Sequence, residues 1–208
     1  MGSGGFTVGT AASVGGRVKG RESGMPNEDC WATFFDAEKT VAALLGADGV
    51  RGNAVEFGCG YGTFTLPAAR RTRGLVSALD IEPEMVALVR LKAENECLTN
   101  IRLEVRDFVA AGTGLGDGTQ AHAMIYNLLH LEDPLGLLSE AYRVLAAEGT
   151  LSVIHWRSDV ATPRGPPLDI RPRPEHCAAW MRQAGFLSIE SVDLEDCCPF
   201  HFGLIGRR

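Results

Sequence analysis

The chain contains 208 residues, of which 45% are hydrophobic and 22% charged, and it carries a formal net charge of −6. This size and composition suit a single globular domain with a complete sheet core and leave no room for a second domain. The acidic balance argues against broad binding to nucleic-acid backbones, and no run approaches the roughly 18 apolar residues of a membrane-spanning helix, so we expect neither nucleic acid nor a membrane as a partner.

The first predicted unit is an N-terminal arm followed by a covering helix. Residues 1–24 are rich in glycine, show little periodicity and contain no apolar segment of signal-peptide length, which predicts a flexible arm. Residues 25–208 then form the single domain, whose first helix is predicted over 25–46. Asn27 is a favourable N-cap, the acids after it complement the helix dipole, and Gly46 ends the helix.

The middle of the chain alternates short apolar runs with amphipathic segments. We predict strands at 53–57, 74–80, 101–106, 121–126 and 150–156. Helices are predicted at 62–71, 82–97 and 134–146, with a glycine-rich loop at 110–119. This order predicts parallel strands joined by helices.

The last part of the chain departs from that alternation. Five prolines within 158–174 preclude a regular helix and predict an ordered, extended loop, and a loop of that length in a compact domain is more often functional. A helix at 175–184 follows. Two final strands, at 186–193 and 199–206, are predicted to form a hairpin.

Residues 55–69 are the most informative stretch, with the sequence Val-Glu-Phe-Gly-Cys-Gly-Tyr-Gly-Thr-Phe-Thr-Leu-Pro-Ala-Ala. An apolar strand leads into a loop in which Gly58, Gly60 and Gly62 let the backbone turn tightly and approach a ligand closely. The next apolar run ends at Asp80, whose carboxylate can accept both hydroxyls of a ribose. These elements form half of a dinucleotide-type fold and imply a nucleotide-like cofactor.

The charge in this stretch favours one cofactor over another. Glu56 lies two residues before the first glycine and would repel the phosphate oxygens of NAD. S-Adenosylmethionine has no phosphate but carries an ammonium and a sulfonium, both cationic. In addition, Thr63 stands where a dinucleotide-binding sequence has its third Gly or Ala. The residues therefore favour S-adenosylmethionine.

Further segments follow the glycine loop in a familiar order. They are Asp80, Arg-Asp-Phe at 106–108, Met-Ile-Tyr-Asn-Leu-Leu-His at 124–130, and Ala-Tyr-Arg-Val-Leu-Ala-Ala-Glu-Gly-Thr-Leu at 141–151. With them, residues 50–156 resemble the class I S-adenosylmethionine-dependent methyltransferases. The resemblance implies a Rossmann-like α/β fold: a seven-stranded, mostly parallel sheet with an antiparallel last strand and helices on both faces.

The resemblance also implies an activity and a site. The expected enzyme transfers a methyl group from S-adenosylmethionine to a small-molecule acceptor in the cytoplasm and leaves S-adenosylhomocysteine. The expected cofactor-binding residues close the first four strands or follow them: Glu56, Phe57, Gly58, Cys59, Gly60, Gly62, Thr63, Asp80, Ile81, Asp107, Phe108, Asn127 and Leu128.

Within that set, the resemblance gives some residues specific roles. Glu56 would hold the methionine ammonium, Asp80 the ribose with Ile81 packing on adenine, and Asp107 the adenine amino group. The simpler alternatives remain open, namely a strand-end acid, a helix cap and a solvated turn acid. Asn127 would line the methyl end, and because no Pro-Pro-Tyr follows it, methylation of nucleic-acid bases loses support.

Two histidines and one loop are the candidates for acceptor chemistry. His130 and His155 stand at or just beyond strand ends, where an imidazole could remove a proton or could simply shape the pocket. The segment 157–174 would close over the acceptor together with Trp31. It carries four arginines that suit a carboxylate or phosphate, which makes an anionic acceptor an option: Arg157, Arg164, Arg171 and Arg173. The alternative is that these arginines pair with acids of the covering helix.

Two other functions remain open. The chain has six cysteines without a C-x-x-C pair, which fits reduced thiols, and Cys30, Cys177, Cys197 and Cys198 could converge to support arsenite or thiol methylation. No standard zinc signature is present, so no metal site is assigned. The other alternative is a non-catalytic module that binds S-adenosylmethionine only as a ligand. The oligomeric state cannot be read from the sequence.

Overall fold

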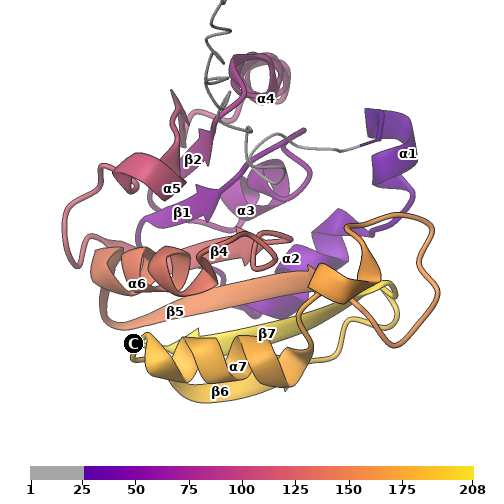
Figure 1. Cartoon of the computed structure of the whole chain (residues 1–208). Helices are drawn as coiled ribbons and strands as arrows, with labels where there is room; N and C mark the ends of the chain where they lie inside the picture. The colour runs from indigo at the N-terminus through magenta and orange to yellow at the C-terminus, as the bar shows by residue number, and fades with distance from the viewer. Residues whose placement is uncertain (1–25) are drawn as a thin grey trace, which may run out of the picture.

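A single mixed sheet runs through the protein, with β1 near its centre. The computed structural model describes residues 26–208, so the predicted arm over 1–24 lies outside the described residues. In chain order the strands are β1 (Ala54–Phe57), β2 (Val76–Asp80), β3 (Ile101–Val105), β4 (Gln120–Tyr126), β5 (Leu145–Trp156), β6 (Leu187–Val192) and β7 (His201–Arg207). Their spatial order is β3-β2-β1-β4-β5-β7-β6 (Figure 1). Strands β1 to β5 pair in parallel and β7 is antiparallel to both neighbours, which confirms the predicted sheet.

The register of the parallel strands gathers their carboxyl ends at one edge. Phe57 at the end of β1 pairs with Leu79 of β2 and with Ile125 of β4, and Ile125 in turn pairs with Val153 of β5. The residues that follow these four strands therefore meet at the same edge. In open α/β sheets this edge is where ligands bind.

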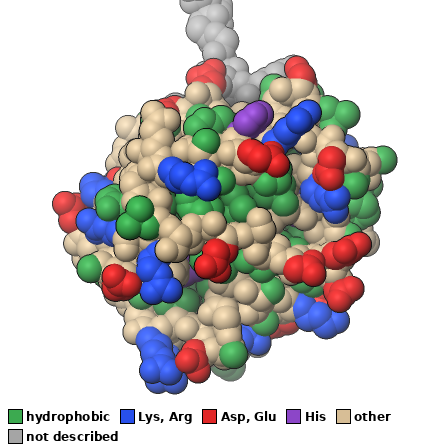
Figure 2. Space-filling model, turned by 90° about the horizontal axis from the view of Figure 1, so that it is seen from below, with side chains coloured by type: hydrophobic (Ala, Val, Ile, Leu, Met, Phe, Trp, Pro, Cys, Tyr) green, Lys and Arg blue, Asp and Glu red, His purple; other side chains and the backbone are tan. Residues whose placement is uncertain are grey.

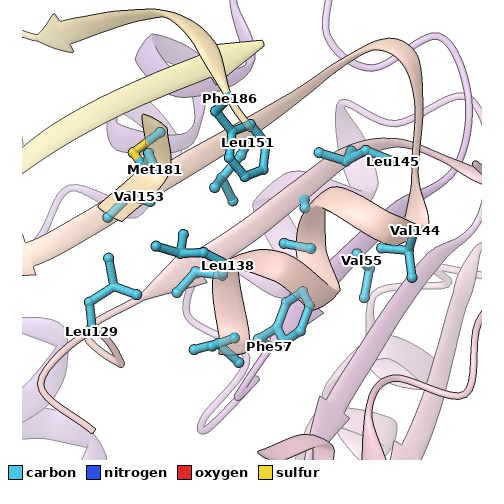
Figure 3. Packing of buried hydrophobic residues seen from close by; sticks show 14 of the residues in the cluster. Val55, Phe57, Leu129, Leu138, Val144, Leu145, Leu151, Val153, Met181 and Phe186 are labelled. Carbon is cyan, nitrogen blue, oxygen red and sulfur yellow. The ribbon is translucent and has the colours of Figure 1, made fainter. Parts of the chain in front are cut away.

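Helices cover both faces of the sheet. They are α1 (Glu28–Ala32), α2 (Ala37–Leu45), α3 (Thr65–Arg70), α4 (Pro83–Asn95), α5 (Phe108–Ala111), α6 (Pro134–Val144) and α7 (Pro174–Gln183). Because side chains alternate along a strand, β1 sends Val55 and Phe57 toward α6 and Ala54 toward α2 and α3. Figure 3 shows the first of these two cores, in which Leu138 of α6 lies fully buried against the sheet.

The covering helix predicted over 25–46 is two helices, and this prediction was wrong. The backbone N–H of Asp36 donates to the carbonyl of Cys197 at 2.7 Å, so a contact from the far end of the chain turns the backbone between α1 and α2. The Asp36 side chain then accepts from the N–H of Lys39 at 3.1 Å and caps α2. Asp36 is a typical N-cap residue, so the sequence carries a local signal for the start of α2.

Two further differences from the prediction have an identifiable cause, and the other predicted ends of helices and strands shift by at most three residues. The segment predicted as a glycine-rich loop from residue 110 begins inside α5, because Asp107 accepts from the N–H of Ala110 at 3.0 Å and caps a short helix. Strand β5 begins at Leu145 and not at residue 150, since a register irregularity lets Gln120 of β4 pair with Leu145. Neither change moves the carboxyl ends of the strands.

One face of the protein carries charges of both signs. Figure 2 shows acidic and basic side chains interspersed with hydrophobic ones on this face. No helix between residues 26 and 208 is long and apolar enough to cross a membrane.

Candidate active site

The loop between β1 and α3 has the backbone shape that its glycines predict. Gly58, Gly60 and Gly62 have φ angles of 75°, 48° and 78°, which residues with a Cβ rarely adopt. A Cβ on Gly62 would also lie 3.0 Å from a methyl group of Val89. On the other side, the position of a Cβ on Gly58 lies 3.4 Å from Leu128, so the loop after β4 lies directly against the glycine loop.

Three successive N–H groups of this loop are bound to the end of β2. Those of Gly58 and Cys59 both donate to the carbonyl of Leu79 at 2.9 Å, and that of Gly60 donates to the Asp80 carboxylate at 2.8 Å. A loop that cradles a pyrophosphate presents its N–H groups to the ligand instead. A ligand can therefore pack against this loop, but these three N–H groups are already bound to protein acceptors.

Glu56 is a buried carboxyl directly beneath the glycine loop. It is 1% exposed, and the Thr65 hydroxyl donates to its Oε2 at 2.5 Å. Burial raises the pKa of Glu56 to about 8, with the Thr65 bond acting in the opposite direction and the nearby Asp80 carboxylate raising it further. Thr65, on the first turn of α3, is a residue of this site that the sequence reasoning missed.

Asp80 ends β2 and joins two elements. Besides the bond from Gly60, its Oδ1 accepts from the N–H of Glu82 at 3.0 Å, just before α4. Burial raises the pKa of Asp80, and these backbone donors lower it in part. The helix-cap alternative for Asp80 is thus present in the structure. Each oxygen keeps a further lone pair, which leaves room for hydroxyl donors.

Asn127 follows β4 in a left-handed conformation, with φ of 59°. Its Oδ1 and Nδ2 are both buried and form no hydrogen bond with the described residues. Buried amide atoms nearly always have a partner, so this pair is suited to a bound polar group. An unsatisfied amide, two carboxyls and a tight glycine loop lie at the same edge of the sheet, and this set of residues fits the uncharged ribose and the cationic amino-acid part of S-adenosylmethionine.

The residues predicted around adenine lie at the ends of β2 and β3. Ile81 is half-buried after β2. Phe108 packs edge-on against Phe57 with ring centroids 5.5 Å apart, and Asp107 caps α5 beside it. The structure thus brings these side chains to the expected edge.

The segment before α2 covers the glycine loop. The indole Nε1 of Trp31 donates to Oγ1 of Thr63 at 3.0 Å, and the Tyr61 hydroxyl donates to the carbonyl of Pro26 at 2.9 Å. Lys92 of α4 forms an ion pair with Glu28 of α1 and donates to the Tyr61 carbonyl. The first part of the covering segment, from Pro26 to Trp31, is therefore attached to the loop at more than one point.

An aromatic cluster joins this segment to the loop after β5. Trp156 at the end of β5 lies with its ring centroid 6.3 Å from that of Trp31 and 5.6 Å from that of Phe34. Figure 1 shows α1 and the loop after β5 at the same end of the sheet. The 157–174 segment thus leaves the sheet at the edge that carries the glycine loop.

Arg171 organises that segment from within. Its guanidinium donates to the carbonyls of Pro166, Arg157 and Arg164 and to the hydroxyl of Thr162 at 2.7–3.0 Å. The guanidinium carbon also lies 5.7 Å from the centroid of the Trp156 ring. These bonds use four of its five N–H groups. Arg171 therefore mainly stabilises the conformation of the loop.

The other three predicted arginines remain at the surface of the segment. Arg157 pairs with Asp159, while Arg164 and Arg173 are exposed. The acids of the covering helices bind elsewhere, Glu28 to Lys92 and Asp36 to Lys39, so pairing between the two segments is not what holds them together.

The two predicted histidines lie within hydrogen-bond distance of each other. Nδ1 of His130, in the loop after β4, is 3.2 Å from Nε2 of His155 near the end of β5. His155 is fully buried, and burial lowers its pKa to about 3, with His130 and Arg171 acting in the same direction. Burial and Arg171 also lower the pKa of the partly exposed His130. Both rings are neutral at physiological pH.

The cysteines do not converge as the alternative required. Cys177 lies in the core on the α7 side of the sheet, Cys197 and Cys198 lie in the opposite core, and Cys30 is exposed. Between residues 26 and 208, no group of three His, Cys, Asp or Glu side chains is placed to hold a metal ion. The sheet separates Cys177 from Cys197 and Cys198, so the convergence on which this alternative depended does not occur.

Comparison with known proteins agrees with this geometry. Residues 54–149 match the family of methyltransferase domains. No curated protein matches the chain in sequence. A S-adenosylmethionine-dependent methyltransferase from Aquifex aeolicus superposes with a TM-score of 0.71 at 22% identity, covering 84% of this chain and 90% of that one.

Two further solved structures show how varied the relatives of this fold are. The geranyl diphosphate C-methyltransferase of Streptomyces coelicolor A3(2), in complex with Mg²⁺, geranyl diphosphate and S-adenosyl-L-homocysteine, has a TM-score of 0.66 at 15% identity, covering 82% of this chain and 78% of that one. The cyclase SpnF has a TM-score of 0.65 at 19% identity, covering 82% and 79%. At these identities the likeness shows a shared fold.

The buried carboxyl of Glu56 predicts a pH dependence of stability. Its ordinary pKa is 4.5 and its folded pKa about 8, so between these values the unfolded state ionises while the folded state keeps its proton. Its contribution to the free energy of unfolding is therefore full below pH 4.5 and is lost as the pH rises to 8, by up to about 1.4 kcal/mol per pH unit. The free energy of unfolding can be measured by urea denaturation of wild type and Glu56→Gln at pH 5.5 and pH 8. It should decrease less in the variant than in wild type when the pH rises from 5.5 to 8.

The matched control for this measurement is Glu84→Gln, an exposed position on α4. It should show the same decrease between the two pH values as wild type. An equal decrease in Glu56→Gln and wild type would show that the Glu56 carboxyl is not held protonated.

The bonds of Arg171 predict that its removal loosens one segment. Arg171→Ala should accelerate amide hydrogen exchange across 157–171 by at least about tenfold, which corresponds to about 1.4 kcal/mol of local opening. Arg164→Ala, which removes an exposed side chain from the same segment, should leave exchange near the wild-type rate. Unchanged exchange in Arg171→Ala would contradict the fastening role.

Proposed function

We propose that the chain is a class I S-adenosylmethionine-dependent methyltransferase that transfers the methyl group to a small-molecule acceptor; residues 54–149 match the family of methyltransferase domains, and the fold is shared with a S-adenosylmethionine-dependent methyltransferase. The observation that carries the choice of cofactor is a glycine loop whose Gly58, Cys59 and Gly60 N–H groups are bound within the protein, next to the carboxyls of Glu56 and Asp80. The ionised carboxylate of Asp80 repels phosphate and attracts an ammonium or a sulfonium, and a cationic group bound beside Glu56 would favour loss of the Glu56 proton. This arrangement supports S-adenosylmethionine over NAD.

Each cofactor role follows from the position of a residue at the edge of the sheet. Asp80 accepts the ribose hydroxyls, Glu56 faces the amino-acid part, and the buried amide of Asn127 satisfies a polar group at the methyl end. Asp107 and Phe108 border the adenine. When bound, S-adenosylmethionine supplies an electrophilic methyl group on its sulfonium.

The acceptor is proposed to enter between the loop after β4 and the 157–174 segment. The fastening by Arg171 makes this segment a preformed wall, which lowers the entropy lost when an acceptor binds. Arg164 and Arg173 are exposed on it and are the arginines with free reach toward an anionic acceptor. The aromatic rings of Trp31 and Trp156 exclude water from the region beneath.

A second reading is that the protein uses S-adenosylmethionine without transferring its methyl group. The cyclase SpnF shares the fold, so the fold alone does not fix the reaction. A direct test is to incubate the protein with methyl-labelled S-adenosylmethionine and a metabolite extract and to identify what gains label. A labelled small molecule, absent with Asp80→Asn, supports methyl transfer, whereas tight cofactor binding with no labelled product supports the second reading.

The cofactor assignment predicts selective stabilisation. S-Adenosylhomocysteine should raise the melting temperature in a concentration-dependent way, and NAD should not. Asp80→Asn replaces the charged acceptor of the ribose hydroxyls, a change of about 1.5–3 kcal/mol, so calorimetry should show affinity reduced by roughly ten- to a hundredfold.

Asp48→Asn is the matched control, because Asp48 is exposed and forms an ion pair with Arg51 at the surface. Its affinity for S-adenosylhomocysteine should equal that of wild type. Wild-type affinity in Asp80→Asn would remove the ribose assignment, and stabilisation by NAD would remove the cofactor assignment.

A further inference from the structure

Two hydrogen bonds fix which nitrogen atoms of His155 and His130 carry protons. Nδ1 of His155 lies 3.2 Å from the carbonyl oxygen of Trp156, and a carbonyl can only accept. Nδ1 of His155 must therefore carry the proton. Because this ring is neutral, its Nε2 carries a lone pair and acts as an acceptor.

The same reasoning passes to the second ring. Nε2 of His155 accepts from Nδ1 of His130 across 3.2 Å, so Nδ1 of His130 carries the proton of that ring. Its Nε2 is then left with a lone pair. This atom has no hydrogen-bond partner among the described residues and is not one of the buried polar atoms, so it is open to an incoming molecule.

The location of this lone pair is suited to chemistry on the acceptor. His130 follows Leu128 by two residues, and Leu128 lies against Gly58 of the cofactor loop. The charged and titratable groups that face the pair are the Arg171 guanidinium and His201, and Arg171 disfavours protonation of both rings. His130 is thus kept neutral and its lone pair available.

We propose that His130 Nε2 is the atom that receives the proton of the methyl acceptor, and that His155, held by the Trp156 carbonyl, is a positioning residue that fixes the tautomer of His130. This inference rests on the proposed function. The nucleophilic atom of the acceptor forms a bond to the methyl carbon, the bond from that carbon to sulfur breaks with its electron pair retained by sulfur, and the proton of the nucleophile moves to His130. The acceptor class is therefore one whose nucleophile carries a proton, such as a hydroxyl, thiol or amine.

Tautomers can be measured without any acceptor. Long-range ¹H–¹⁵N NMR spectra of ¹⁵N-labelled protein at pH 7 should show both His130 and His155 protonated at Nδ1 and unprotonated at Nε2, with assignments from single His→Gln variants. In His155→Phe, which keeps a flat ring beside Phe202 but has no acceptor, His130 should lose its fixed Nδ1–H tautomer. In His155→Gln, whose amide oxygen can accept at the same place, the tautomer should persist.

Turnover gives the second readout, with the acceptor identified by the labelling experiment. His130→Gln should lower turnover by about a hundredfold to ten-thousandfold, the usual contribution of a general base. His155→Gln should retain more turnover than His155→Phe, and His176→Gln, at an exposed position on α7, should match wild type. Affinity for S-adenosylhomocysteine should stay within about twofold in all of them.

The outcomes separate this proposal from the one on which it rests. A His130 ring protonated at Nε2 in the wild-type protein, or unchanged turnover in His130→Gln, would overturn the proton-acceptor assignment while leaving methyl transfer intact. Failure to bind S-adenosylhomocysteine would instead overturn the proposed function, and the tautomer spectra would be unaffected.

Discussion

The attachment of the glycine loop to the end of β2 is the constraint on which the site depends. The carbonyl of Leu79 and the carboxylate of Asp80 together take three successive N–H groups of the loop, so β1, β2 and the first turns of two helices keep one relative position. This attachment buries the carboxylate of Asp80, and burial raises its pKa. The same atoms that hold the loop also give the site its negative character, so structure and cofactor preference have one cause.

A second layer of contacts closes the edge of the sheet around that loop. Trp31 donates to Thr63, and the Trp156 ring links the covering segment to the loop after β5, where Arg171 holds four acceptors together. The covering segment and the loop after β5, which are far apart in the sequence, thus pack together at this edge of the sheet. Such preorganisation is what methyl transfer requires, because an in-line approach to the sulfonium depends chiefly on positioning.

In the proposed mechanism, the histidine pair directs proton transfer without a carboxylate. A backbone carbonyl orients one imidazole and that imidazole orients the next, so the direction of both hydrogen bonds starts from the end of β5. Burial keeps the inner ring neutral, and Arg171 acts in the same direction. The roles proposed for His155 and His130 differ because His155 is fully buried and His130 is partly exposed.

The sequence by itself determined the order of strands and helices, the glycine loop and the acids at the strand ends, because hydrophobic periodicity and positive-φ glycines are local signals. It did not determine the break between α1 and α2 or the cap of α5. Asp36 and Asp107 gave local hints, but the bond from Asp36 to Cys197 joins residues far apart in the chain. Only the tertiary structure decided that the sheet separates Cys177 from Cys197, that Arg171 binds its own loop, and that His130 meets His155. Each of these depends on which residues the packed sheet brings together, and no pattern of spacing along the chain contains that information.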